Sequence, residues 1–126
     1  NEFRPLILVA EDDDSNFKLI KAIIGKKCDI QWAKNGEEIV ALFKEYGKEA
    51  KAILMDIKMP VMNGLDATKI IREENKEIPI IMQTAYAFSS DKENAMNAGA
   101  SEVLVKPITL SILRGTLTKY FPELVW

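Results

Sequence analysis

Leu6-Ile-Leu-Val-Ala-Glu-Asp-Asp-Asp14 joins five apolar residues directly to four acidic ones. An apolar run of this length is typical of a buried strand, and the apolar spacing of three and four residues from Phe17 to Ile24 predicts a helix over 15–24. The same order recurs along the chain, because four more apolar runs of strand length follow, at 28–33, 52–55, 78–82 and 102–105.

Helical patterns alternate with these runs. Asn35, Ser90 and Thr109 are the residue types expected at helix N-caps, Ser90 within a capping-box pattern, and Gly99 is a typical helix end. The last helix is expected to run to about Tyr120. Five strand–helix units predict an α/β domain whose central parallel sheet is covered by helices on both faces, since the strands are apolar almost throughout. A doubly wound strand order of 2-1-3-4-5 suits five such units.

The composition limits the chemistry open to this chain. Its 126 residues suffice for one domain, and a net charge of −2 lacks the basic excess expected of direct nucleic-acid binding. Histidine is absent and Cys28 is the only cysteine, which excludes histidine-dependent triads and cysteine-based zinc sites. We expect no membrane insertion, because no apolar stretch approaches a membrane span. The lone cysteine and the absence of a signal peptide favour a cytoplasmic location.

Polar residues end the predicted strands: Glu11 and Asp12, then Asp56, Thr84 and Lys106. In a doubly wound sheet the ligand crevice lies beyond the carboxyl ends of the strands, and in the order 2-1-3-4-5 the first and third strands are neighbours. Three carboxylates would therefore converge and repel one another, which a hard cation such as Mg²⁺ relieves. With a lysine and a hydroxyl added, this set suits a phosphoryl group, and an aspartate can form an acyl phosphate.

Each of these residues alone has a simpler interpretation. The acidic run from Glu11 to Asp14 could form a solvated turn and helix cap, Asp56 could cap a strand, and Thr84 and Lys106 could be ordinary loop residues. Their convergence on one crevice, each with a role in the same chemistry, favours the functional interpretation.

Four segments resemble the receiver domain of bacterial response regulators: Ile7–Asp14, Met55–Gly64, Thr84-Ala85 and Lys106-Pro107. They occur in the family's order, and Met55-Asp-Ile-Lys-Met-Pro-Val-Met-Asn-Gly64 is highly specific. The resemblance covers about Leu6 to Tyr120. It implies a flavodoxin-like (βα)5 fold and a single receiver domain over residues 1–126, with its core at about 6–120.

The resemblance also implies roles for the acidic residues. Asp56 would accept a phosphoryl group from a phosphohistidine. Asp12 and Asp56 would bind Mg²⁺ directly, Glu11 would act mainly through water, and Lys58 would donate its backbone carbonyl to the metal. The side chains of Lys58 and Tyr86 would flank the phosphoryl group, and the bulky Tyr86 suggests slow hydrolysis.

Thr84 and Lys106 match the family's hydroxyl and lysine that bind the phosphoryl oxygens, and Pro107 matches a proline that often follows a cis peptide bond. The family usually has Tyr or Phe at the position of Val103, so coupling of an aromatic ring to Thr84 is in doubt here. Movement of Thr84 would still repack the face formed by the helix between Ser90 and Gly99, the strand at 102–105 and the last helix, where a downstream domain would bind.

The phosphodonor implied is a histidine kinase or a histidine phosphotransfer domain. The missing initiator Met and the sequence of the first loop, Glu11-Asp-Asp-Asp-Ser-Asn16, favour a hybrid sensor histidine kinase as the parent protein. A stand-alone regulator and an amino-terminal regulator domain are the alternatives. Such a domain mediates its own phosphorylation and dephosphorylation. Two other functions remain open, namely a Mg²⁺-dependent phosphatase that uses the Asp-x-Asp spacing of Asp12 and Asp14, and a degenerate receiver that only binds partners.

Overall fold

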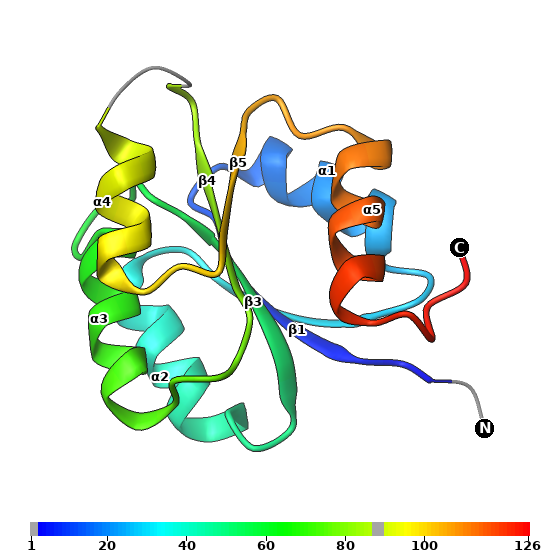
Figure 1. Cartoon of the computed structure of the whole chain (residues 1–126), viewed down its shortest axis with the longest axis horizontal. Coiled ribbons are helices and arrows are strands. Elements are labelled where there is room, and N and C mark those ends of the chain that lie inside the picture. Colours follow the sequence, from blue (N-terminus) through cyan, green and yellow to red (C-terminus); the bar gives the residue numbers. More distant parts are fainter. Residues whose placement is uncertain (1–2, 87–89) are drawn as a thin grey trace.

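The computed structural model describes residues 3–86 and 90–126, so residues 1–2 and 87–89 of the expected domain lie outside it. Strands and helices alternate as the sequence predicts (Figure 1). The elements in chain order are β1 (Leu6–Ala10), α1 (Asp14–Ile24), β2 (Asp29–Ala33), α2 (Gly36–Tyr46), β3 (Ala50–Asp56), α3 (Gly64–Glu74), β4 (Ile80–Thr84), α4 (Asp91–Ala98), β5 (Glu102–Val105) and α5 (Leu110–Tyr120).

The five strands form one parallel sheet in the order β2-β1-β3-β4-β5, which confirms the predicted order 2-1-3-4-5 and the α/β fold. Helices α1 and α5 cover one face, and α2, α3 and α4 cover the other (Figure 1). The first strand lies beside the third, with Ala10 opposite Met55, and Asp56 at the end of β3 lies opposite Gln83 of β4. The carboxyl ends of β1, β3 and β4 therefore meet at one edge of the sheet.

Alternate residues of each central strand enter two separate apolar cores. Leu8 of β1 and Ile53 of β3 pack on the side of α2, α3 and α4, whereas Val9 and Leu54 pack on the side of α1 and α5. This two-sided burial explains why the strands are nearly continuous apolar runs. Cys28 belongs to the second core, where burial raises the pKa of its thiol to about 11.

Helix ends follow the sequence signals with one exception. The Asn35 side chain accepts a hydrogen bond from the Glu38 N–H at 2.8 Å, and Thr109 caps α5 in the same way. Gly99 ends α4 with a φ of 116°, a conformation that favours glycine. The capping box at Ser90 is wrong: α4 begins after this residue, but Ser90 has helical backbone angles and its side chain makes no cap hydrogen bond.

The strand and core boundaries differ slightly from expectation. β4 begins at Ile80 rather than Ile78, since Pro79 has no N–H to donate to the sheet. β3 begins earlier than predicted, at Ala50. The buried core also continues past Tyr120, because Phe121 and Leu124 pack in the same core as α1 and α5. None of the described helices has the length and apolar character needed to cross a bilayer.

Candidate functional site

Three carboxylates meet at the carboxyl edge of the sheet, as the sequence predicts. Glu11 and Asp12 follow β1, Asp56 ends β3, and one oxygen from each lies within 4.8 Å of the others. Glu11 and Asp56 are buried, whereas Asp12 is exposed. They line a crevice of about 250 Å³ that also includes Lys58, Thr84 and Lys106.

Lys106 bridges the two buried carboxylates. Its Nζ lies 3.0 Å from Asp56 Oδ2 and 3.3 Å from Glu11 Oε1. Burial alone would lower the pKa of the Lys106 ammonium, but the hydrogen bond and charge of Asp56, together with Glu11, raise it instead. Lys106 is therefore a firmly charged ammonium held against the Asp56 carboxylate. The peptide bond between Lys106 and Pro107 is cis, as the resemblance implies.

Glu11 carries the strongest electrostatic perturbation in the crevice. Burial, followed by the negative charge of Asp56, raises the pKa of this carboxyl to about 7, and Lys106 opposes the shift only in part. The Glu11 carboxylate also accepts a hydrogen bond from the Asp13 N–H at 3.2 Å. Lys106 contacts only two of the three clustered carboxylates, so the cluster has an excess of negative charge that a cation would relieve.

The donor set fits a hard divalent cation. Its candidate ligands are carboxylate oxygens at or just after the ends of β1 and β3, and such oxygens are the ones Mg²⁺ prefers. Asp14 does not join them, because its carboxylate lies 3.5 Å from Lys34 Nζ instead. The Asp-x-Asp pair that the phosphatase alternative needs is therefore not assembled in the acidic cluster.

Thr84 lines the crevice from the end of β4, but its hydroxyl is already engaged. It donates to Asp91 Oδ2 at 3.0 Å in the first turn of α4, and it accepts a hydrogen bond from the Tyr86 N–H at 3.1 Å. Asp91 was not predicted from the sequence, because an acidic residue in the first turn of a helix gives no sign of a contact with another element. Val103 packs against the core beneath α2, α3 and α4.

In the loop after Asp56, the backbone at Gly64 lies directly against the backbone of Asp56 and Ile57. The Gly64 N–H donates to the Ile57 carbonyl at 2.8 Å, and a Cβ on Gly64 would lie only 2.1 Å from the Asp56 carbonyl oxygen. Only glycine fits there, which accounts for the end of the specific segment. Lys58 points its ammonium over the Tyr86 ring, 4.3 Å from the centroid, so these two side chains meet beside the crevice.

Two further residues hold or line the crevice and were not predicted. The Trp32 indole N–H donates to the Glu11 carbonyl at 2.8 Å, while its ring stacks on Phe17 at 3.9 Å. Gln83 is buried in β4 opposite Asp56. Its sequence signal was available, since it is an amide inside the apolar run Ile80-Ile-Met-Gln-Thr84.

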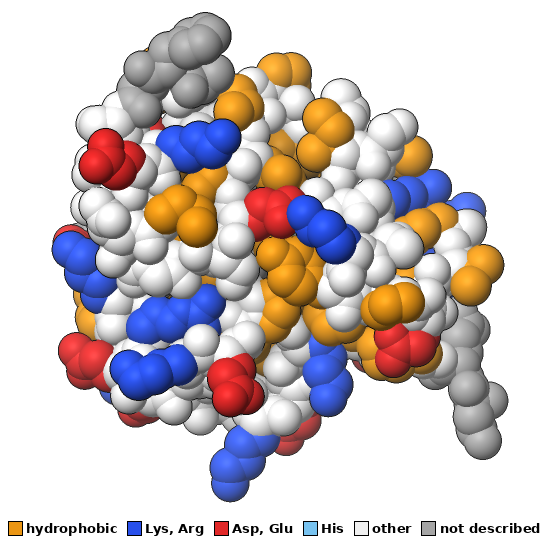
Figure 2. All heavy atoms as spheres, in the orientation of Figure 1, with side chains coloured by type: hydrophobic (Ala, Val, Ile, Leu, Met, Phe, Trp, Pro, Cys, Tyr) orange, Lys and Arg blue, Asp and Glu red, His pale blue; other side chains and the backbone are white. Residues whose placement is uncertain are grey.

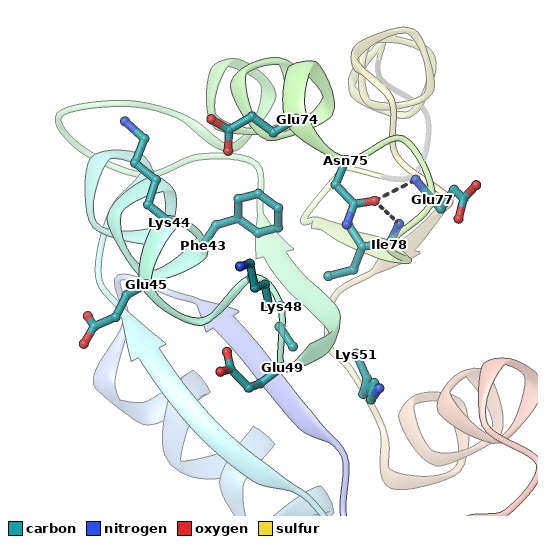
Figure 3. A pocket seen from close by; sticks show the side chains of 12 residues that line it. Phe43, Lys44, Glu45, Lys48, Glu49, Lys51, Glu74, Asn75, Glu77 and Ile78 are labelled. Atoms are coloured by element: carbon teal, nitrogen blue, oxygen red, sulfur yellow. Dashed lines mark hydrogen bonds between the residues drawn. The ribbon is translucent and has the colours of Figure 1, made fainter.

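A larger hollow lies at the opposite edge of the sheet, where α2 and α3 end (Figure 3). It has a volume of about 940 Å³, and Figure 3 shows its lysines and glutamates pointing in different directions around the rim. The Asn75 side chain accepts hydrogen bonds from the Glu77 and Ile78 N–H groups, which shapes the loop. This hollow lacks the convergent charge of the acidic crevice.

The family model of the response regulator receiver domain matches residues 7–118. The chain belongs to this family. This receiver domain is 41% identical, over 93% of its length, to hybrid signal transduction histidine kinase I of Dictyostelium discoideum. It spans only 7% of that kinase, so it corresponds to one small part of a much longer relative.

Solved structures agree with this receiver fold. The receiver domain of the sensor histidine kinase PA1611 from Pseudomonas aeruginosa, solved with a magnesium ion in its active-site cleft, has a TM-score of 0.87 and 30% identity, covering 94% of this chain and 98% of that one. The receiver domain of Ssk1 from Saccharomyces cerevisiae, solved with the histidine phosphotransfer protein Ypd1, has a TM-score of 0.87 and 28% identity over 99% of this chain and 95% of that one. The chain is thus a receiver domain of two-component signal transduction.

Proposed function

We propose that Asp56 is the phosphoacceptor of this receiver domain and takes its phosphoryl group from a phosphohistidine. The observation that carries the proposal is the contact between the Asp56 carboxylate and the Lys106 ammonium at 3.0 Å, inside a cluster of three carboxylates. A carboxylate held beside a fixed positive charge is oriented for attack on phosphorus. The chain contains no histidine, so the donor histidine belongs to another domain or another chain.

In the transfer, an Asp56 oxygen attacks phosphorus and forms a P–O bond as the P–N bond of the donor breaks. The electron pair of the broken bond stays on the imidazole nitrogen, and Asp56 becomes an acyl phosphate. The developing charge lies on the three equatorial phosphoryl oxygens. Lys106 supplies positive charge to one of them, and the Thr84 hydroxyl donates to another after it leaves Asp91.

We propose that Asp12 and Asp56 hold Mg²⁺ directly, with Glu11 acting through water and the Lys58 carbonyl completing the protein ligands. The acidic cluster and the magnesium ion in the PA1611 receiver domain support this assignment. A bound Mg²⁺ supplies positive charge against the incoming phosphoryl oxygens. Without it, three carboxylates and one ammonium would repel an anionic donor.

The proposed donor is a histidine kinase or a histidine phosphotransfer domain, since Ypd1 binds a receiver domain of this fold. The proposed docking site for a downstream domain is the face formed by α4, β5 and α5. Release of Asp91 by Thr84 would alter the first turn of α4 on this face. Figure 2 shows several separate hydrophobic side chains on the side of α4, β5 and α5, and the exposed ones on these elements include Met96 of α4, Val105 of β5 and Leu110 of α5.

We infer that residues 1–126 form one receiver domain within a hybrid sensor histidine kinase, acting on the cytoplasmic side. The identity to the Dictyostelium hybrid kinase supports this parent. A stand-alone regulator is the alternative, and the sequence flanking this chain in the full-length protein distinguishes the two.

Phosphorylation by acetyl phosphate with Mg²⁺, followed by intact mass, tests the proposed acceptor. We expect one phosphoryl group per chain in the wild type, none in Asp56→Asn, and full labelling in the control Asp66→Asn, which changes an exposed aspartate of α3. Labelling that persists in Asp56→Asn would refute the assignment. Continuous turnover of small phosphate esters would favour the phosphatase alternative instead.

A further inference from the structure

Gln83 is a buried amide beside the proposed phosphoacceptor. It is 1% exposed, and its register partner on the neighbouring strand is Asp56. Adjacent residues in a parallel pair point to the same face of the sheet, so the Gln83 and Asp56 side chains share the face covered by α1 and α5. Gln83 lines the acidic crevice together with Asp56 and Lys106.

The Gln83 amide nitrogen has no hydrogen-bond partner. Within residues 3–86 and 90–126, Gln83 Nε2 is the buried side-chain nitrogen or oxygen for which no partner is found. An unpaired donor in the interior costs folding free energy, because it gives up its hydrogen bond to water without gaining another. Such a group is expected to gain a partner in some other state of the protein.

Two other donors at the crevice are already engaged in this state. The Lys106 ammonium contacts two carboxylates, and the Thr84 hydroxyl donates to Asp91. Gln83 also borders a smaller hollow of about 40 Å³ between Lys106 and Ile20, so there is space around its head group. A half-turn of the amide about its last bond exchanges the oxygen and the nitrogen without moving the strand.

We propose that the Gln83 amide is a phosphoryl-positioning group, which donates an N–H hydrogen bond to a phosphoryl oxygen on Asp56. The inference rests on the proposed function of Asp56. No proton or bond is transferred by Gln83: it supplies a neutral donor aimed at charge that the phosphoryl group brings. The amide has no partner before phosphorylation and gains one afterwards, so its hydrogen bond favours the phosphorylated state alone.

The test replaces the amide with an apolar side chain of nearly the same length, Gln83→Met, with Gln83→Leu as a second variant. Without a phosphoryl group, we expect the free energy of unfolding in urea to stay equal or rise, because an unpaired donor is removed. We expect the dissociation constant of beryllofluoride, a phosphoryl analogue, to rise about tenfold in the presence of Mg²⁺, the effect of one hydrogen bond to a charged group. The dissociation constant of Mg²⁺ alone should change less than about twofold, since no proposed ligand is altered.

Gln31→Met is the matched control, because Gln31 lies on β2, away from the crevice. It should leave beryllofluoride binding unchanged. Equal beryllofluoride affinity in the wild type and both Gln83 variants would overturn the inference. A lower free energy of unfolding in both variants would also overturn it, because water would then already satisfy the amide. If the wild type itself fails to bind beryllofluoride and is not labelled by acetyl phosphate, the proposed function of Asp56 fails instead.

Discussion

Tyr86 and Lys58 form a contact at the side of the crevice, which we expect to affect the lifetime of a phosphoryl group on Asp56. The Lys58 ammonium lies 4.3 Å from the centre of the Tyr86 ring, and the ring is about half exposed. The two residues come from different loops, one after β3 and one after β4. Both residues line the crevice that contains Asp56, so we expect their contact to hinder the approach of water and to slow hydrolysis.

We predict that Tyr86→Ala shortens the lifetime of the aspartyl phosphate. A cation–π contact at an exposed site contributes about 0.5–1 kcal/mol, which corresponds to a two- to fivefold faster hydrolysis. The decay of phosphorylated protein after removal of acetyl phosphate, followed by intact mass, measures it. Tyr86→Phe keeps the ring and should retain the wild-type lifetime, whereas an unchanged lifetime in Tyr86→Ala would contradict the shielding role.

Single residues show where the sequence was sufficient and where it was not. Glu11, Asp12, Asp56 and Lys106 could be placed together because each ends an apolar run, and parallel strands end at one edge. The place of Gln83 at the end of an apolar run was also visible in the sequence, but its unpaired amide was not, because whether a buried amide has a partner depends on side chains from several elements.

At the scale of elements, the loop between β3 and α3 contains one residue, Val61, whose backbone conformation is unfavourable for a β-branched side chain. Val61 has a φ of 70°, and the Met62 N–H donates to the Pro60 carbonyl at 2.7 Å across it. This region of backbone space favours glycine and asparagine and is costly for a β-branched residue. The Val61 side chain is 76% exposed, so few packing contacts offset that cost.

We predict that Val61→Asn raises the free energy of unfolding by about 1 kcal/mol, since asparagine tolerates the left-handed region. Urea denaturation measures the change. Val125→Asn is the control, because Val125 is equally exposed but does not have a positive φ. Similar shifts in the two variants would show that the gain comes from surface polarity and not from backbone relief.

Helix caps could be predicted only where the local sequence sets the whole interaction. Asn35 and Thr109 form the expected caps because each needs only a backbone N–H three residues ahead. Ser90 does not, since its backbone is already helical. In the same helix, Asp91 directs its carboxylate to Thr84. A contact between elements, which no local pattern encodes, therefore links the start of α4 to the crevice.

At the scale of the whole molecule, the prediction that the site residues lie together was based on the strand order. Alternating elements indicated a parallel sheet, and the order 2-1-3-4-5 makes the first and third strands neighbours, so the acidic pair and Asp56 had to meet. The carboxyl boundary of the core was harder to predict. Phe121 and Leu124 follow the last helix without helical spacing, and their burial depends on the surface that α1 and α5 form together.

The segment after α5 closes the core on the side of α1 and α5. Leu124 is 5% exposed and its N–H donates to the Phe121 carbonyl at 3.0 Å. The Trp126 indole N–H donates to Thr118 Oγ1 at 2.9 Å, and the Arg114 guanidinium lies over its ring. These contacts fold the segment back onto α5, so residues beyond Tyr120 should contribute to the stability of the domain.

We predict that Leu124→Ala lowers the free energy of unfolding by about 2–4 kcal/mol, the usual cost of removing a buried leucine side chain. Val125→Ala, one residue further on and 77% exposed, should change it by less than about 0.5 kcal/mol. Urea unfolding of the two variants beside the wild type measures both. Because Leu124 lies on the side of the sheet remote from α4, labelling of Asp56 in the folded Leu124→Ala protein should match the wild type. Equal stability of the two variants would mean that the segment after Tyr120 only lies against the domain and does not form part of its core.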